Sequence, residues 1–499
     1  MVDFVQIPGE WAVPGSYTEI KDVPSQDTLA GMPLRVVIVG QVSGGSASVN
    51  TVYRNVTSGT AAGLFGVGTV LTQAINAFST ERSDIVLDAV GVAPATGGVA
   101  AVGSITFSGT ATSAGTGAVM IGGNRFTFAV ASGASATAAA AALLASLNTQ
   151  ASGANGTVLK IACGLTATVS GAVVTLTAGE TGDASGGNCE IRTTTRTADQ
   201  VPGLTIATSP MQNGAGLPDI TPALQALGET WYSDIVLTGH DAANISAAVL
   251  EARRRNNAMV AKDARVWAAY TGTQAQIQAL AAQFSTAEEL VLIGAQGPYW
   301  SPWVLAAVCA AQGSQSLNSD PSRQLRGIAL NGLSGLGPPA SSQFSSTQRN
   351  VLLTAGCTTL TLNRDGTVNF ERVVTTRQTD PTTGLASGVW DVMIPAIGAR
   401  VRYEWNTYVT ANYYNAKLAD DSSPLANTPG VVTCRTLQAS WVAQCKLYEL
   451  QGWIDDVATL GPTAVFKRDT SDRNRVNSTL PIKPMGSLIV LANQLQMQV

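Results

Sequence analysis

Five short apolar runs, separated by helical segments, are the feature that most limits the folds open to this 499-residue chain. Each run has the composition of a strand buried on both faces of a sheet. Strands that alternate with amphipathic helices predict an α/β layer. The runs are LRVVIVG (34–40), SDIVLDAV (83–90), SDIVLTG (233–239), ARVWAAY (264–270) and ELVLIG (289–294), and LRGIALNGL (325–333) is predicted as a further strand.

A stretch rich in Gly, Ala, Ser and Thr interrupts this layer from about residue 91 to residue 207. It contains short alternating strands with glycine-containing turns, at 103–109, 117–130 and 170–179, and a helix at 134–148. Low-complexity disorder is the alternative for such a composition. The strand periodicity favours a small α+β domain inserted into the chain.

The sequence therefore predicts an α/β and α+β multidomain protein. Three prolines in the first thirty residues favour an extended arm there. A hairpin is expected around Asp365–Gly366, and two amphipathic helices at 398–418 and 434–453. The predicted parts are an arm (1–30), a discontinuous core (31–90 and 208–380), an insertion (91–207), a C-terminal core domain with helices (381–484) and a final strand (485–499).

The last thirteen residues, SLIVLANQLQMQV, alternate as a half-buried strand does. One face carries glutamines, including Gln494, Gln496 and Gln498. The chain then stops, so no following hairpin strand is available as a partner. The strand either closes a sheet of its own domain or completes a sheet in another chain. The apolar face consists of Ile489, Leu491, Leu495, Met497 and Val499.

Charged residues make up only 12% of the chain, against about 25% in a usual soluble protein. Such a chain is expected to cover much of its surface with partners, although an ordinary Ala/Gly-rich enzyme also fits. The net charge of −4 provides no basic field for nucleic acid. No apolar run reaches the ~18–20 residues that span a bilayer, so neither direct nucleic-acid binding nor membrane insertion is expected. The start of the chain lacks the pattern of a signal peptide.

The residues for most catalytic and metal sites are missing from the sequence. His240 is the single histidine, so a multi-histidine metal site is excluded. Six cysteines without a CxxC pair favour reduced thiols. The glycine cluster GQVSGGSAS (40–48) lacks the Gly-Lys step of a P-loop. We expect no enzyme activity, catalytic residue, metal or cofactor, with a nucleotide-dependent α/β enzyme as the alternative.

Several segments, in this order along the chain, resemble the contractile phage tail sheath proteins of the Mu-like family. They are VPGSYTEI, MPLRVVIVGQ, GLFGVGTVLTQAINAF, PYWSPWVLAAVCAA, DPSRQLRGIALNGL, RNVLLTAGCTTLTLNRDGTVNFERVVTTRQT and DRNRVNSTLPIKP. The resemblance implies a structural virion subunit that stacks as hexameric rings in a helical polymer around a tail tube. It also implies contraction from a metastable extended state, contacts with baseplate and tail terminator proteins, and assembly in the host bacterial cytoplasm. A tube, capsid, adhesin or surface-layer protein is the alternative within the structural class.

In the resembled family, both terminal arms donate strands to sheets of neighbouring subunits. Carried over by position, the donors are Ser16, Tyr17, Thr18, Glu19 and Ile20 at one end, and the apolar face from Ile489 to Val499 at the other. Charged surfaces that repack between subunits are a second expectation. The candidates are Arg253, Arg254, Arg255, Arg473 and Arg475. A solvated helix face is the alternative for the first three, and the same alternative of a solvated position applies to Arg473 and Arg475.

Overall fold

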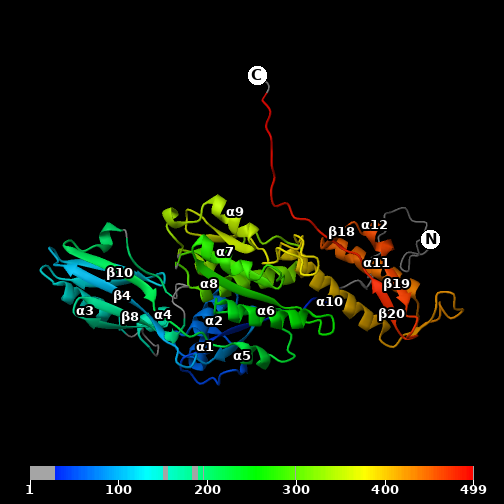
Figure 1. The fold of residues 1–499 in the computed structure, drawn as a ribbon, viewed down its shortest axis with the longest axis horizontal. Helices are drawn as coiled ribbons and strands as arrows, with labels where there is room; N and C mark the ends of the chain where they lie inside the picture. Colours follow the sequence, from blue (N-terminus) through cyan, green and yellow to red (C-terminus); the bar gives the residue numbers. More distant parts are fainter. Residues whose placement is uncertain are drawn as a thin grey trace, which may run out of the picture.

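The computed structural model describes residues 29–149, 156–182, 189–194, 196–297, 299–335 and 337–497. These residues form a mixed α/β protein with several sheets, as predicted. Figure 1 shows three parts along the long axis, with the insertion at one end, the large sheet in the middle and the C-terminal helices at the other end. The predicted donor residues 16–20 and Val499 lie outside the described residues.

The middle part contains an eight-stranded sheet in the order β15-β14-β13-β12-β11-β1-β3-β2. Every neighbouring pair is parallel except β2 with β3 and β15 with β14. The five apolar runs form β1, β3, β11, β12 and β13, which confirms the predicted α/β layer. The strands are β1 (Arg35–Gln41), β2 (Val52–Tyr53), β3 (Val86–Val92), β11 (Asp234–Leu237), β12 (Arg265–Gly272), β13 (Leu290–Gln296), β14 (Cys357–Leu362) and β15 (Val368–Arg372).

Helices cover both faces of this sheet, because successive side chains of each strand point to opposite sides. In β1, Val36 and Ile38 join one buried cluster, whereas Val37 and Val39 join the other. The first cluster includes α1 (Ser58–Phe65), α2 (Val70–Glu81) and α8 (Pro302–Ser319). The second includes α5 (Thr221–Ala226), α6 (Ala242–Asn256), α7 (Gln274–Ala282) and α9 (Ser346–Thr354). The middle part is thus a three-layer doubly wound unit.

Helix α8 approaches the sheet closely at Gly313. A Cβ atom built there would lie only 2.2 Å from the Trp267 ring of β12. Trp267 is fully buried, and its indole N–H donates to the buried Asp234 carboxylate at 2.8 Å. Glycine is therefore required at this position because a larger side chain would collide with Trp267. The helical backbone conformation itself does not demand glycine.

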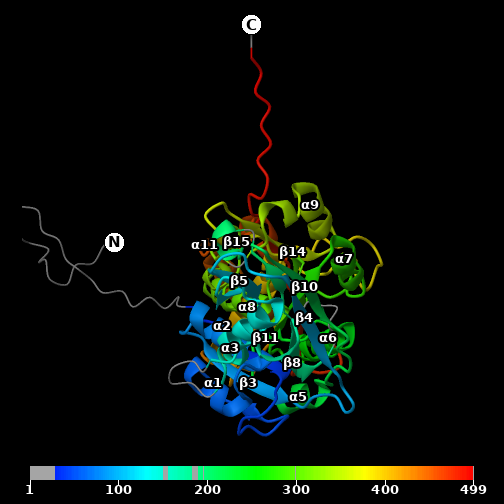
Figure 2. The same cartoon turned by 90° about the vertical axis from the view of Figure 1, so that its left-hand side faces the viewer.

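The insertion consists of two small sheets around one buried cluster (Figure 2). One sheet has the order β10-β4-β8-β7 and the other β6-β5-β9. The alternative of low-complexity disorder is thus wrong for the described residues. Strand β10 runs to Gln212, so the predicted boundary after residue 207 falls inside a strand. The elements are β4 (Ala100–Gly109), β5 (Gly115–Ile121), β6 (Asn124–Val130), α3 (Ala136–Leu147), α4 (Val158–Cys163), β7 (Leu165–Ser170), β8 (Val173–Thr181), β9 (Ile191–Thr193), the 3-10 turn η1 (Thr197–Asp199) and β10 (Leu204–Gln212).

The C-terminal part is joined to the middle part by one long helix, α10 (Met393–Tyr413). Met393 and Ala396 pack into the core beside the large sheet, whereas Ile397 and Val401 belong to a separate cluster. The remaining elements are β16 (Lys417–Leu418), β17 (Val431–Val432), α11 (Cys434–Leu450), β18 (Ile454–Asp455), α12 (Val457–Leu460), η4 (Gly461–Thr463), β19 (Val465–Arg468), β20 (Val476–Thr479) and β21 (Lys483–Pro484).

Some predicted elements are correct and others are not. The hairpin at Asp365–Gly366 is confirmed, with Gly366 at φ +86° between β14 and β15. The strand predicted at 325–333 is wrong. That segment lies along β15 but forms a single bridge, from Ala329 to Asn369. Residues 325–333 contain a turn at Gly327 and the 3-10 turn η2 (Asn331–Leu333) in place of a strand. The 3-10 turn η3 (Ala340–Ser342) follows. The hairpin of β19 and β20 was not predicted.

Candidate assembly interface

The C-terminal segment, residues 485–497, leaves the body of the molecule as an extended trace (Figure 1). None of these described residues belongs to a helix or strand, so the alternative that they close a sheet of their own domain is wrong for this structure. The segment touches the body only near its start, where Arg326 Nη1 donates to the Ile489 carbonyl at 3.2 Å. From Val490 to Met497 every side chain is exposed.

Large apolar side chains on this segment face solvent. Leu495 is 88% exposed, and Met497 is 80% exposed. Sequence reasoning selected the odd-numbered face, but Leu488 and Val490 on the other face are as exposed as Leu491. The continuous run Leu488–Ile489–Val490–Leu491 is the sequence signal that both faces carry apolar side chains. In extended conformation, the first half of the segment is apolar on both faces, which is typical of a strand inside a sheet.

The C-terminal part contains short two-stranded sheets with open edges. Among the residues that the structure describes, β19 pairs only with β20, through four residue pairs. Val465 is 43% exposed, and Asn477, Ser478 and Thr479 are exposed as well. A two-stranded ribbon is marginally stable, and its free N–H and C=O groups are a template for a further strand.

The arginines predicted to contact neighbouring subunits do not all lie on the surface of the subunit. Arg255 is fully buried, and it donates to the carbonyls of Thr230 and Gly228 at 2.6 and 2.9 Å and to Glu251 at 2.7 Å. In this conformation it has no surface to offer, so its prediction as an inter-subunit contact is corrected to a core position. Arg253 and Arg254 are about half exposed, although each is paired within the chain, with Glu289 and Glu251 respectively.

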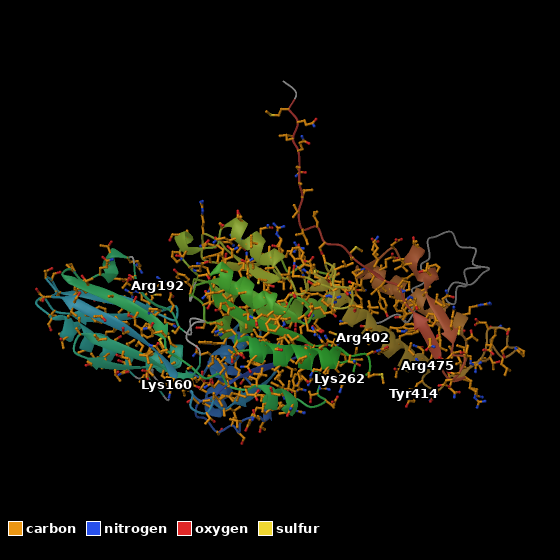
Figure 3. All side chains as sticks on the ribbon, in the orientation of Figure 1. Lys160, Arg192, Lys262, Arg402, Tyr414 and Arg475 are labelled. Atoms are coloured by element: carbon orange, nitrogen blue, oxygen red, sulfur yellow. The ribbon has the colours of Figure 1, made fainter. Side chains whose placement is uncertain are left out.

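The two arginines near the C-terminus are both on the surface. Arg475, 66% exposed, lies at the end of the molecule that is distant from Arg192 of the insertion (Figure 3). Its guanidinium donates to Asn477 at 2.8 Å. Arg473 is exposed in the same β19–β20 turn, and its carbonyl accepts a hydrogen bond from Arg468. Their role between subunits stays a prediction.

The outer face of the larger insertion sheet is covered with hydroxyl groups. The paired residues on this face carry no charge: in β4 they alternate with buried Ile105 and Phe107, and the partners on β7, β8 and β10 continue the same rows. This face explains part of the low charge content of the chain. Its hydroxyl residues are Ser104, Thr106, Ser108, Thr166, Thr168, Ser170, Thr175, Thr177, Thr205 and Ser209.

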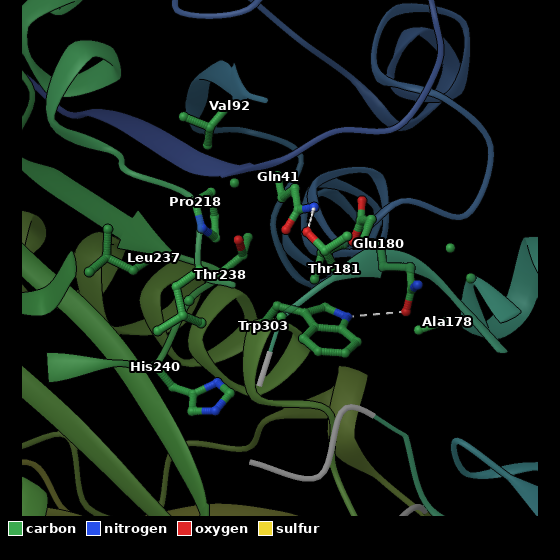
Figure 4. Close-up of a pocket in the computed structure, with 18 of the residues that line it drawn as sticks. Gln41, Val92, Ala178, Glu180, Thr181, Pro218, Leu237, Thr238, His240 and Trp303 are labelled. Carbon is green, nitrogen blue, oxygen red and sulfur yellow. Dashed lines mark hydrogen bonds between the residues drawn. The ribbon is translucent and has the colours of Figure 1, made fainter. Parts of the chain in front are cut away.

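A cavity of about 100 Å³ lies at the carboxyl ends of β1 and β11, between the core and the insertion (Figure 4). The strand order reverses here, which is where doubly wound sheets bind ligands. Both carboxylate oxygens of Glu180 lie 3.1 Å from the backbone N–H of Val70, the first residue of α2. Thr181 lies beside Gln41, with 3.2 Å between their side-chain atoms.

Glu180 occupies the helix N-terminus where a phosphate of a nucleotide would bind. Burial raises the pKa of its carboxyl to about 8. The remaining volume is well below the about 300–1,000 Å³ of ordinary ligand pockets. His240 lines this cavity and contacts the ring of Tyr270, at 5.4 Å between centroids. The arrangement disfavours the nucleotide-dependent alternative, because the insertion itself fills the anion position.

Further observations concern metals, thiols and membranes. Within the described ranges, no group of three or more His, Cys, Asp or Glu side chains is placed to hold a metal ion. All six cysteines are free thiols, and five are buried. Of the helices described, none is long and apolar enough to cross a bilayer.

Comparison with known proteins adds to this geometry. Residues 213–376, which span the sheet from β11 to β15, match the family described as phage tail sheath protein central domain. The Mu-like prophage FluMu tail sheath protein of Haemophilus influenzae is 26% identical over 481 residues, which is 95% of each chain. The central part of this chain, residues 213–376, belongs to the phage tail sheath family. The predicted family is thereby confirmed.

Two solved sheath tail proteins are also similar in structure to this sheath protein. That of Desulfitobacterium hafniense is 12% identical, with a TM-score of 0.47, over 95% of this chain and 97% of the other. That of Listeria innocua is 10% identical, also with a TM-score of 0.47, over 92% and 94%.

The family assignment decides several predictions from the sequence. This sheath protein is a structural, non-enzymatic component of the virion tail, as predicted. The alternatives of an α/β enzyme and of a capsid, tube, adhesin or surface-layer protein are therefore wrong.

Proposed function

We propose that this sheath protein polymerises as stacked hexameric rings around a tail tube in a metastable extended state. The sheath then contracts and drives the tube through the host envelope for genome delivery. Each subunit donates its final strand, Ile489 to Val499, and residues 16–20 to neighbouring subunits. The partners are other copies of the chain, the tube protein, and the baseplate and terminator proteins, with assembly in the bacterial cytoplasm.

The observation that supports this proposal best is the exposure of the C-terminal segment. Leu488, Val490, Leu491, Leu495 and Met497 are all at least 70% exposed. Burial of a side chain of this size is worth about 1.5–3 kcal/mol, so five give roughly 7–15 kcal/mol before the loss of chain entropy is subtracted. A segment with this composition is stable in solvent only at a large cost, which favours a binding site on another subunit.

Strand addition to the C-terminal part of a neighbour is consistent with the open edges of β19 and β20. The backbone of the added strand would supply hydrogen bonds, and alternate side chains would supply specificity. Such a link holds neighbours while the connecting residues change direction. Contraction then needs no nucleotide, because the energy is stored in bistable contacts between subunits.

We also propose the division into parts as predicted, with a tail-sheath-like core, an inserted domain and two strand-donating arms. Strand β10 ends at Gln212 and pairs with β4. The insertion is therefore better ended near residue 212 than at residue 207.

Deletion of residues 487–499 tests the proposal. The truncated protein is expected to retain the circular dichroism spectrum and melting temperature of the full chain, because the deleted described side chains pack little against the body. Full-length protein should form hollow sleeves or striated cylinders in negative-stain electron microscopy, and the truncated protein should form none. Normal sleeves from the truncated protein would exclude strand donation by this segment.

A further inference from the structure

The first described residues are anchored by a buried carboxylate on helix α10. The backbone N–H groups of Ala30 and Gly31 donate to the two oxygens of Glu404, at 2.8 and 3.1 Å. Glu404 is only 3% exposed, and Leu29 packs against the same C-terminal cluster. The chain at Ala30 and Gly31 is therefore fixed on α10.

Arg400, one turn earlier on α10, holds this carboxylate in place. Its Nε lies 2.9 Å from Glu404 Oε1, and its Nη1 donates to the Asn318 carbonyl at the end of α8 at 3.1 Å. Arg400 is 8% exposed, and its guanidinium lies over the ring of Trp453 at 4.8 Å. An arginine that stacks on an aromatic ring and pairs with a carboxylate has few alternative rotamers.

Trp453 in turn anchors the C-terminal segment. Its carbonyl accepts the N–H of Met485 at 2.9 Å, and the next residues, Ile454 and Asp455, pair with Pro484 and Lys483. Trp453 is 3% exposed, whereas Met485 is 38% exposed, so this contact lies where the segment reaches the surface. The exposed segment starts at Met485, directly beyond this anchor.

We propose that Glu404, Arg400 and Trp453 form one arm joint, which positions both terminal arms relative to each other. Contacts of these three residues lead from Ala30 and Gly31 to Met485, and the last contact is made by the backbone carbonyl of Trp453. The three side chains are buried in the subunit, so they act on assembly through the directions of the arms and not by touching a neighbour. The proposal rests on the proposed strand donation, because it concerns how the two donor arms are held.

Hydrogen exchange of the isolated subunit, followed by mass spectrometry, tests this coupling without polymerisation. Glu404→Gln keeps the shape of the side chain but replaces one acceptor oxygen by an amide donor. Loss of a hydrogen bond to a charged group is expected to raise exchange about tenfold or more in peptides containing Ala30 and Gly31. The arm joint predicts that the peptide containing Met485 also exchanges at least several times faster, although Glu404 makes no contact with it.

Arg402→Gln is the matched control. Arg402 lies on the same helix and pairs with Asp263, but it contacts neither arm, so exchange at both anchors should stay as in the wild type. Faster exchange only at Ala30 and Gly31 in Glu404→Gln would overturn the coupling. If Glu404→Gln fails to fold, Arg400→Lys provides the same measurement, and unchanged exchange at Met485 would again overturn it. Sleeve formation, measured separately, reports on strand donation, so the two proposals can fail independently.

Discussion

The carboxyl group of Glu180 lies 3.1 Å from the backbone N–H of Val70, so the insertion caps helix α2 of the core. The two residues are 110 positions apart in the sequence. Since the carboxyl is desolvated by burial, its pKa is raised from 4.5 to about 8. This contact makes the junction between the insertion and the core dependent on pH.

The first prediction concerns the pH dependence of that junction. A carboxyl whose pKa is higher in the folded state gives its full stabilisation below the unfolded pKa of 4.5, and this is lost as the pH rises through about 8. The melting temperature should therefore fall between pH 5 and pH 8.5. Glu180→Gln should reduce this fall, to which Glu190, with a pKa raised by burial to about 7, also contributes. It should stabilise the protein at pH 8.5 by about 2–4 kcal/mol.

Glu229→Gln is the control for this measurement. The pKa of Glu229 is lowered, chiefly by its hydrogen bond with Lys262, so it has no titration of the same sign in this pH range. Thermal melts of the three proteins at pH 5.5, 7 and 8.5 provide the comparison. An identical fall in the wild type and in Glu180→Gln would show that another group is responsible.

The second prediction separates a core arginine from a surface arginine. Arg255→Met should destabilise the subunit by about 2–4 kcal/mol, because the carbonyls of Gly228 and Thr230 and the Glu251 carboxylate lose the buried guanidinium as donor. Arg254→Met, at a side chain 45% exposed, should change the free energy of unfolding by less than about 1 kcal/mol, because Glu251 keeps Arg255 and Glu229 keeps Lys262 as partners. Urea denaturation measures both. Equal stabilities for the two variants would contradict the assignment of Arg255 to the core.

The third prediction compares two helical glycines. Gly313→Ala should destabilise by about 1–3 kcal/mol, because its methyl group would collide with Trp267. Gly398→Ala, on the exposed face of α10 with no atom within 4 Å of the new Cβ, should stabilise by about 0.5–1 kcal/mol. The same urea denaturation shows whether each substitution raises or lowers the free energy of unfolding. A stabilising Gly313→Ala would mean that α8 can move away from the sheet at little cost.

The fourth prediction tests which face of the C-terminal segment is buried on assembly. Leu495→Asp and Gln494→Asp introduce the same charge at adjacent exposed positions. Neither should change the melting temperature of the subunit. Leu495→Asp should abolish sleeve formation, because a charge would enter an apolar site, whereas Gln494→Asp should reduce it much less. Sedimentation and negative-stain microscopy measure the assembled fraction, and equal effects would argue against a half-buried strand.

Much of the fold follows from local patterns in the sequence. The apolar runs around Val36, Leu87 and Val291 have few ways to be buried except as central strands, and the hairpin glycine at 366 adopts a positive φ that few other residues tolerate. The lack of a P-loop lysine can likewise be read directly from the sequence. By contrast, the strand predicted at 325–333 was wrong, because its apolar side chains are buried by turns that lie along β15.

The tertiary structure alone decided which residues far apart in the chain meet. Glu180 and Val70, or Glu404 and Ala30, carry no local pattern that marks them as partners, because such contacts depend on how separate layers pack. Burial likewise depends on the surroundings of a side chain, which is why three consecutive arginines, 253 to 255, have one core member and two surface members. The alternation of the C-terminal segment was readable from its residues, but its exposure became visible only once the rest of the chain had folded without it.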